Sequence, residues 1–218
     1  MNPRYTEWLK YVFDRPATPN GWYFDIEDLE PFEAEPSELA ELVAVTFENC
    51  GRDLVPYSNE QLRHGLSYIV DNSASDVVFS LMSEHVPTEL RVTAIAGLKH
   101  LYSQVLEPRC APVLGHTSEP GDNALNYICY MLWDISPLSN WECSPERSIF
   151  YRSVCDVLEQ ALKSPNRACV ESGLHGLGHI YSSYPDRVEQ VIDRYLKDAR
   201  PQDELQQYAM DARRGHVQ

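Results

Sequence analysis

The sequence of 218 residues predicts an all-α fold in a single domain. Apolar residues recur at steps of three and four along most of the chain, for example at Val188, Val191, Ile192 and Tyr195, and this is the spacing of one helix face. No stretch alternates with the period of two that is typical of a half-buried strand. Ser-Pro and Pro-acidic pairs supply helix starts, because Ser caps a helix and Pro is tolerated in its first turn.

Helix-start signals and periodicity together divide the chain into about ten helices. Ser58 and Gln61 fit a capping box, in which each side chain satisfies an amide of the other end of the motif. Ser144 and Ser164 each precede a Pro and are expected to cap the helices that follow. The last two helices open with Pro and then acidic residues, which suit the positive end of the helix dipole. The expected helices span residues 3–13, 36–51, 58–71, 74–84, 87–106, 122–135, 145–163, 165–182, 185–198 and 201–213.

A weak internal repeat is present in the helical part. Gly65, Gly97 and Gly176 each begin the pattern Gly-Leu-x-x-aliphatic, and they lie 32 and 79 residues apart, close to one and two units of about 40 residues. A degenerate copy is expected within 127–135. Glycine costs about 1 kcal/mol in a helix, so its recurrence indicates a point where neighbouring helices approach closely. The pattern resembles HEAT or armadillo repeats, and the resemblance implies an α-α superhelix of stacked helical hairpins over residues 37–198, with no activity attached.

The first 36 residues do not fit the repeat and are expected to cap one end of it, leaving residues 37–218 as the repeat body of one domain. No Lys or Arg occurs between Pro16 and Gly51, where acidic and aromatic residues are interleaved. We expect an interaction surface here, with aromatic anchors and steering acids for a basic partner. The alternative is that the aromatic residues are buried and the acids only solvate the surface. The residues concerned are Trp22, Tyr23, Asp25, Glu27, Asp28, Glu30 and Glu33.

The most specific chemical pattern in the sequence is a set of residues that could bind a metal. Glu171, His175 and His179 lie at i, i+4 and i+8 of one expected helix. Two His at that spacing can chelate a divalent metal such as zinc, and a carboxylate one turn earlier could be the third ligand. The glutamate of the H-E-x-x-H metalloprotease motif is missing, so hydrolytic chemistry is not implied. The alternative is that the glycines of this helix mark a close helix contact, which the histidines flank.

Net charge restricts the partners. Lys and Arg number 18 against 33 Asp and Glu, which gives −15 at pH 7. Such a field repels nucleic-acid phosphates and anionic lipid heads, so neither nucleic acid nor membrane is expected as a partner. The chain also has no apolar run of about 20 residues and no leader pattern at its N-terminus, which predicts a cytoplasmic protein.

Two functional hypotheses follow. The leading one is a non-catalytic, acidic protein-interaction module, of the inhibitor or immunity type, that binds a basic protein and needs no cofactor; a homo-oligomer is compatible with it. High acidity is also common among soluble bacterial proteins. The alternative is a metal-binding helical enzyme that uses Glu171, His175 and His179. No catalytic residue is assigned beyond these ligands.

Overall fold

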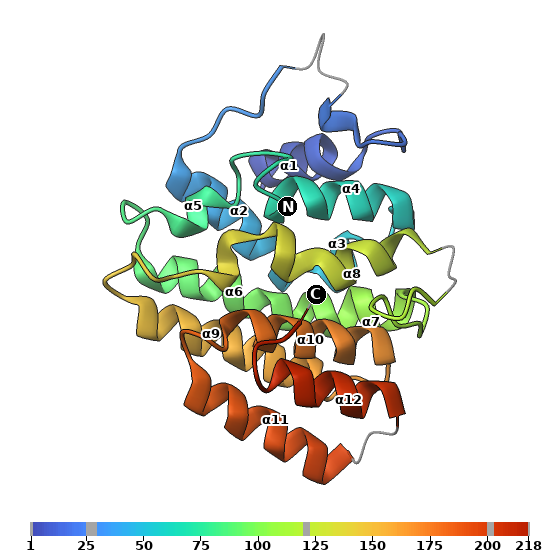
Figure 1. The fold of residues 1–218 in the computed structure, drawn as a ribbon. Helices are drawn as coiled ribbons and strands as arrows, with labels where there is room; N and C mark the ends of the chain where they lie inside the picture. The colour runs from blue at the N-terminus through green and yellow to red at the C-terminus, as the bar shows by residue number, and fades with distance from the viewer. Residues whose placement is uncertain (1, 25–29, 120–122, 200–202, 218) are drawn as a thin grey trace.

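The computed structural model describes residues 2–24, 30–119, 123–199 and 203–217, and every regular element in those ranges is helical (Figure 1). The all-α prediction is confirmed. The α-helices are α1 (Pro3–Phe13), α2 (Pro36–Glu48), α3 (Cys50–Asp53), α4 (Asn59–Val70), α5 (Phe79–Met82), α6 (Thr88–Leu101), α7 (Glu107–Arg109), α8 (Ala124–Ile135), α9 (Arg147–Ala161), α10 (Arg167–Ile180), α11 (Pro185–Ala199) and α12 (Asp203–Ala212). Short 3-10 turns occupy Trp22–Phe24 and Pro137–Ser139, and a π-helical segment, Tyr102–Leu106, joins α6 to α7. Across the described ranges, none of these helices is long and apolar enough to cross a membrane.

Helix boundaries follow local chemistry in most places, with corrections at two serines and in the expected helix 74–84, of which only Phe79–Met82 (α5) is helical. The capping box of Ser58 and Gln61 is present. Ser144 and Ser164, however, do not cap helices: α9 and α10 begin two residues later than expected. Each Ser hydroxyl instead accepts a hydrogen bond from the amide two residues on, which closes a turn ahead of the helix. Asn166 then caps α10 through its own side chain.

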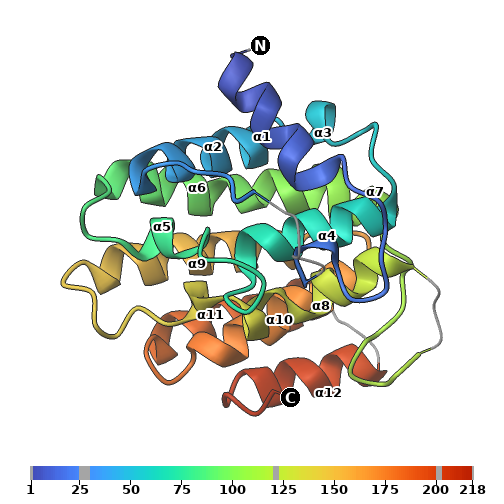
Figure 2. The same ribbon diagram turned by 90° about the horizontal axis from the view of Figure 1, so that it is seen from above.

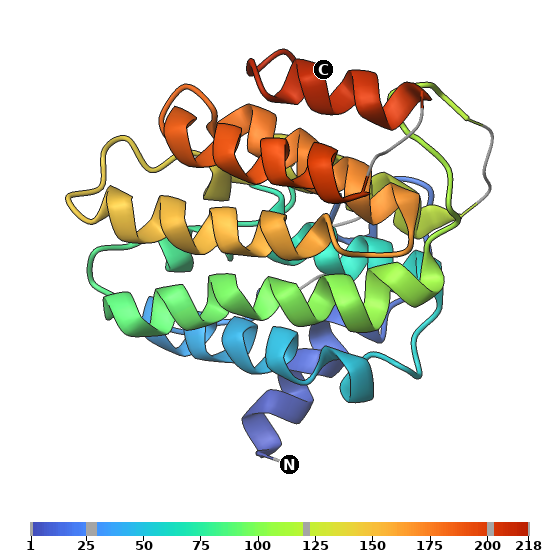
Figure 3. The same ribbon diagram turned by 90° about the horizontal axis from the view of Figure 1, so that it is seen from below.

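The helices form two layers. α2, α6, α9 and α11 lie side by side in one layer (Figure 3), and α4, α8, α10 and α12 contact one another in sequence in the other. The chain passes from one layer to the other at each of these helices, and the apolar residues between the layers form one continuous core. α1 packs against α2 and α4 at one end, and α12 lies at the opposite end (Figure 2).

The recurrent glycines mark close helix contacts, as their chemistry predicts, but they do not mark equivalent repeat positions. Gly65 and Gly176 lie in the layer of α4 and α10, whereas Gly97 lies on α6 in the other layer. A Cβ added at Gly65 would come within 2.2 Å of the Phe13 ring, and one at Gly97 within 2.8 Å of Phe47 Cβ. The shared property is therefore a helix crossing that leaves no room for a side chain.

Replacing Gly176 with Ala is expected to destabilise the fold, although Gly→Ala within a helix normally stabilises by about 1 kcal/mol. The added Cβ would lie 2.4 Å from Leu158 Cδ2 and 2.8 Å from Trp133 Cδ1, and both side chains are buried. Overpacking of this kind costs about 1–3 kcal/mol. Urea denaturation should show a lower midpoint at unchanged slope. A variant as stable as the wild type would contradict the close crossing of α8, α9 and α10.

Candidate metal centre

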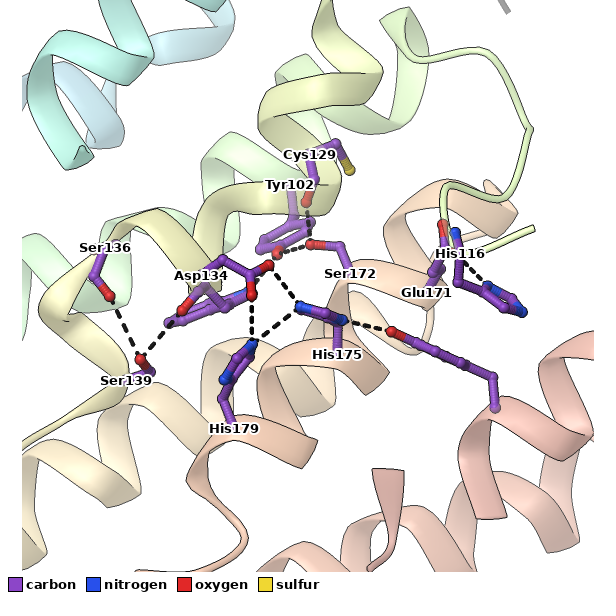
Figure 4. Close-up of polar contacts among 12 residues, drawn as sticks. Tyr102, His116, Cys129, Asp134, Ser136, Ser139, Glu171, Ser172, His175 and His179 are labelled. Atoms are coloured by element: carbon purple, nitrogen blue, oxygen red, sulfur yellow. Dashed lines mark hydrogen bonds and ion pairs between the residues drawn. The ribbon is translucent and has the colours of Figure 1, made fainter. Parts of the chain in front are cut away.

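Three side chains of the kinds that can ligate a metal, from two helices, converge on one point. α10 presents His175 and His179 one turn apart, with their Nε2 atoms separated by 3.0 Å. Asp134 of α8 places Oδ2 2.6 Å from His175 Nε2 and Oδ1 3.0 Å from His179 Nε2 (Figure 4). One donor atom from each residue can be chosen so that all lie within 4.8 Å of one another. This is the arrangement of a chelating site.

The centre lies at the edge of the core, with one side open to solvent. His175 is fully buried, whereas the side chains of Asp134 and His179 are 27% and 29% exposed. Burial by itself would raise the pKa of Asp134, but the hydrogen bonds with His175 and His179 outweigh it and hold that pKa below its usual range. Asp134 is therefore an ionised carboxylate at neutral pH.

Tyr208 of α12 closes the far side of His175. Its Oη lies 2.5 Å from His175 Nδ1, the ring nitrogen that faces away from Asp134. The Tyr208 ring stacks on the His116 imidazole at a centroid distance of 4.2 Å. Burial, reinforced by a hydrogen bond with Tyr130, raises the pKa of Tyr208, so its phenol is neutral.

A buried hydrogen-bond network holds α8 against α10. Trp133 Nε1 donates to Tyr102 Oη at 2.9 Å, and Tyr102 Oη lies 2.6 Å from Ser172 Oγ. Ser172 in turn donates to the carbonyl of Cys129 on α8. Trp133 adjoins Asp134 and Ser172 lies one turn before His175, so the network keeps the two ligand-bearing helices in register (Figure 4).

Glu171 is placed against a loop and not with the two histidines that the sequence grouped with it. Its buried carboxylate accepts hydrogen bonds from the amides of Gly115 and His116 at 2.7 and 2.9 Å, and pairs with the His116 ring. The physical reason is helical drift, since eight residues at 3.6 per turn rotate a side chain by about 80°. The loop amides then satisfy the carboxylate, and it supplies no donor to the centre.

Asp134 is the candidate ligand that sequence reasoning missed. It lies 41 residues before His175, and nothing in local spacing connects the two. One signal was available, because Asp134 is the only charged residue in α8. A lone charge on an otherwise apolar helix needs a partner, and it often marks a functional site.

The two aromatic residues expected to anchor a partner at the N-terminal surface are not exposed. Trp22 and Tyr23 are buried, and the Trp22 ring packs on Tyr68 at a centroid distance of 4.8 Å. Glu30 and Glu33 are exposed, whereas the other three expected residues, Asp25, Glu27 and Asp28, lie outside the described residues. Burial of the aromatic residues agrees with the alternative interpretation of this segment.

No family model, curated protein or solved structure matches this chain. The centre formed by Asp134, His175 and His179 is the feature of the molecule that points to a function.

Proposed function

We propose that this protein binds a divalent transition-metal ion through Asp134, His175 and His179 and uses the ion to activate water. The observation that carries the proposal is the convergence of these three donor groups within 4.8 Å. Two imidazoles with one carboxylate suit Zn²⁺, Fe²⁺ and related ions, and differ from the all-oxygen sets that Ca²⁺ and Mg²⁺ prefer.

The distances between the donor atoms are close to those expected when all three residues bind one cation. Bonds of about 2.0–2.1 Å place the ligand atoms of a tetrahedral zinc site about 3.3 Å apart. His175 Nε2 lies 2.6 Å from Asp134 Oδ2, and His179 Nε2 lies 3.0 Å from Asp134 Oδ1 and 3.0 Å from His175 Nε2, so an outward movement of the side chains would admit the ion. The two Nε2 atoms face each other at 3.0 Å, and a cation between them would satisfy both lone pairs and the carboxylate together.

The open side of the centre supports catalysis more than a purely structural role. Catalytic zinc sites keep three protein ligands and leave a position for water, whereas structural sites are closed by four. The partial exposure of Asp134 and His179 leaves room for that water. A bound ion lowers the pKa of its water to about 7 and polarises a carbonyl, so metal-assisted hydrolysis is the reaction class that fits best. The net charge of −15 favours neutral or cationic substrates over polyanions.

Metal content tests the proposal directly. Protein stripped with a chelator and then reconstituted with Zn²⁺ should retain one equivalent after desalting, as measured by plasma mass spectrometry. Asp134→Ala and His179→Ala should lose it. His100→Ala is the matched control, because His100 is exposed on α6 and its ring forms a hydrogen bond with Gln104, away from the centre. Sub-stoichiometric metal in the wild type, or full retention in both ligand variants, would rule out this centre.

We propose the acidic interaction module as a second function, on the evidence of charge alone. Glu30, Glu33, Glu41 and Glu48 are exposed along and before α2, in a chain of net charge −15. A basic protein captured at physiological salt should be retained less well by a Glu30→Lys, Glu33→Lys variant. Equal retention by this variant would exclude these two residues from any such contact.

We further infer that the two layers form an α-α superhelix of the HEAT or armadillo type. Support comes from the order of the chain, which alternates between layers through the pairs α2–α4, α6–α8, α9–α10 and α11–α12. In an experimental structure, successive pairs should superpose with a constant rotation.

A further inference from the structure

We propose that Tyr208 is a positioning residue for the metal ligand His175, and that through it the C-terminal helix α12 is coupled to occupancy of the metal centre. This inference rests on the proposed metal function. It adds a residue and a helix that no ligand pattern in the sequence includes.

The contact between His175 Nδ1 and Tyr208 Oη provides an acceptor for the ring hydrogen when Nε2 binds a cation. His175 Nε2 faces Asp134 and His179, and it can bind a cation only through an unprotonated lone pair. With a cation bound, the ring hydrogen must be on Nδ1, which lies 2.5 Å from Tyr208 Oη and would then donate to it. Without this acceptor, the hydrogen would favour Nε2, where the Asp134 carboxylate at 2.6 Å accepts it, and the lone pair that the cation needs would be lost. Hydrogen bonds of this kind orient metal-binding histidines in general.

Tyr208 can serve as this acceptor because its own hydrogen is engaged elsewhere. Its phenol forms a hydrogen bond with Tyr130 of α8, the helix that also carries Asp134. The Tyr130 ring lies 4.8 Å from the His175 ring at a tilt of 48°. The contacts thus run from α10 through α12 to α8, and they join the two ligand-bearing helices by a route outside the metal centre itself.

The Tyr208 ring is also held by a stacking contact. His116 stacks on it with an interplanar angle of 17°, and Glu171 holds His116 through the ring and the backbone amide. Glu171 therefore supports the centre indirectly: it holds His116, and His116 stacks on Tyr208, which contacts His175. Glu171, which the sequence grouped with the two histidines as a ligand, instead helps to hold the residues that pack against His175.

The remaining polar contacts of α12 are near the surface. Arg213, which directly follows α12, pairs with Asp193 and Glu189 of α11, and Glu204 of α12 pairs with Arg167 of α10, all with substantial side-chain exposure. Exposed pairs of this kind contribute little. The buried bond between Tyr208 and His175 is thus the polar contact of α12 best placed to sense the ion. If the ion favours docked α12, docked α12 must favour the ion by the same factor.

Titration with Co²⁺, a spectroscopically visible substitute for Zn²⁺, tests the assignment on the full chain. Tyr208→Phe should weaken Co²⁺ binding by about 10- to 100-fold, the usual effect of losing such an outer partner, and should alter the visible absorption of the bound ion. Tyr195→Phe is the matched control: Tyr195 is buried on α11, and its hydroxyl forms no hydrogen bond with another residue in the described part of the chain. This control should keep wild-type affinity and spectrum.

Hydrogen exchange of the α12 amides tests the coupling. Co²⁺ should slow exchange in the wild type and have little effect in Tyr208→Phe. A merely structural tyrosine would lower the stability of the metal-free protein while leaving affinity and spectrum unchanged, and that result overturns the inference but not the proposed function. If the wild type fails to bind Co²⁺ or Zn²⁺, both are overturned.

Discussion

Excess Zn²⁺ is expected to raise the free energy of unfolding of the wild-type protein by about 4 kcal/mol when free metal reaches 1,000 times the dissociation constant. A ligand that binds only the folded chain stabilises it by mass action, and here the ligands come from two helices that are adjacent only after folding. Asp134 is on α8, whereas His175 and His179 are on α10. The measurement is chemical denaturation at several zinc concentrations.

The Asp134→Asn variant distinguishes stabilisation by bound zinc from the stability of the metal-free fold. The amide keeps the shape of the side chain and its hydrogen-bonding reach but removes the negative charge, so most of the zinc-dependent stabilisation should disappear. His100→Gln, an exposed change on α6, should retain it. A wild type whose unfolding is independent of zinc would contradict the prediction, because the only metal-binding group of this kind found among the described residues would then have no measurable affinity.

Replacing Arg91 with Met is expected to cost about 3 kcal/mol of stability. Arg91 is 1% exposed, and its guanidinium donates to the carbonyls of Leu81 and Met82 at 2.8 and 3.3 Å. The same group lies 4.3 Å from the centroid of the Phe150 ring. Met fills the aliphatic space but leaves these carbonyls without their donor, and a buried unsatisfied group costs about 1–3 kcal/mol. Loss of the contact with the ring adds to that cost.

Two further variants serve as controls for the effect of Arg91→Met on stability. Arg152→Met removes an exposed arginine of α9 and should change stability by no more than about 0.5 kcal/mol. Arg91→Lys keeps the charge but not the planar set of donors, so it should also destabilise. Burial lowers the pKa of Arg91, and the nearest carboxylate, that of Glu146 at 3.8 Å, opposes this only in part. Arg91→Met with an unchanged denaturation midpoint would show that the two carbonyls find other donors.

The sequence by itself determined the features that depend on near neighbours in the chain. α1 has the expected bounds, and the capping box of Ser58 and Gln61 forms as its spacing predicts. The pairing of His175 with His179 was likewise readable, because four residues make about one helical turn. Ser144 and Ser164 show the limit even of local reasoning, since their hydroxyls close a turn before the helix instead of starting it.

Only the tertiary structure decided what these local features contact. Asp134 replaces Glu171 beside the histidines, and Tyr208 reaches His175 from a third helix. The burial of Trp22 depends in the same way on packing against Tyr68. The physical reason is common to all three. Periodicity specifies which face of a helix is apolar, but the side chain that meets that face depends on how the layers stack, and this is set by contacts between residues tens of positions apart.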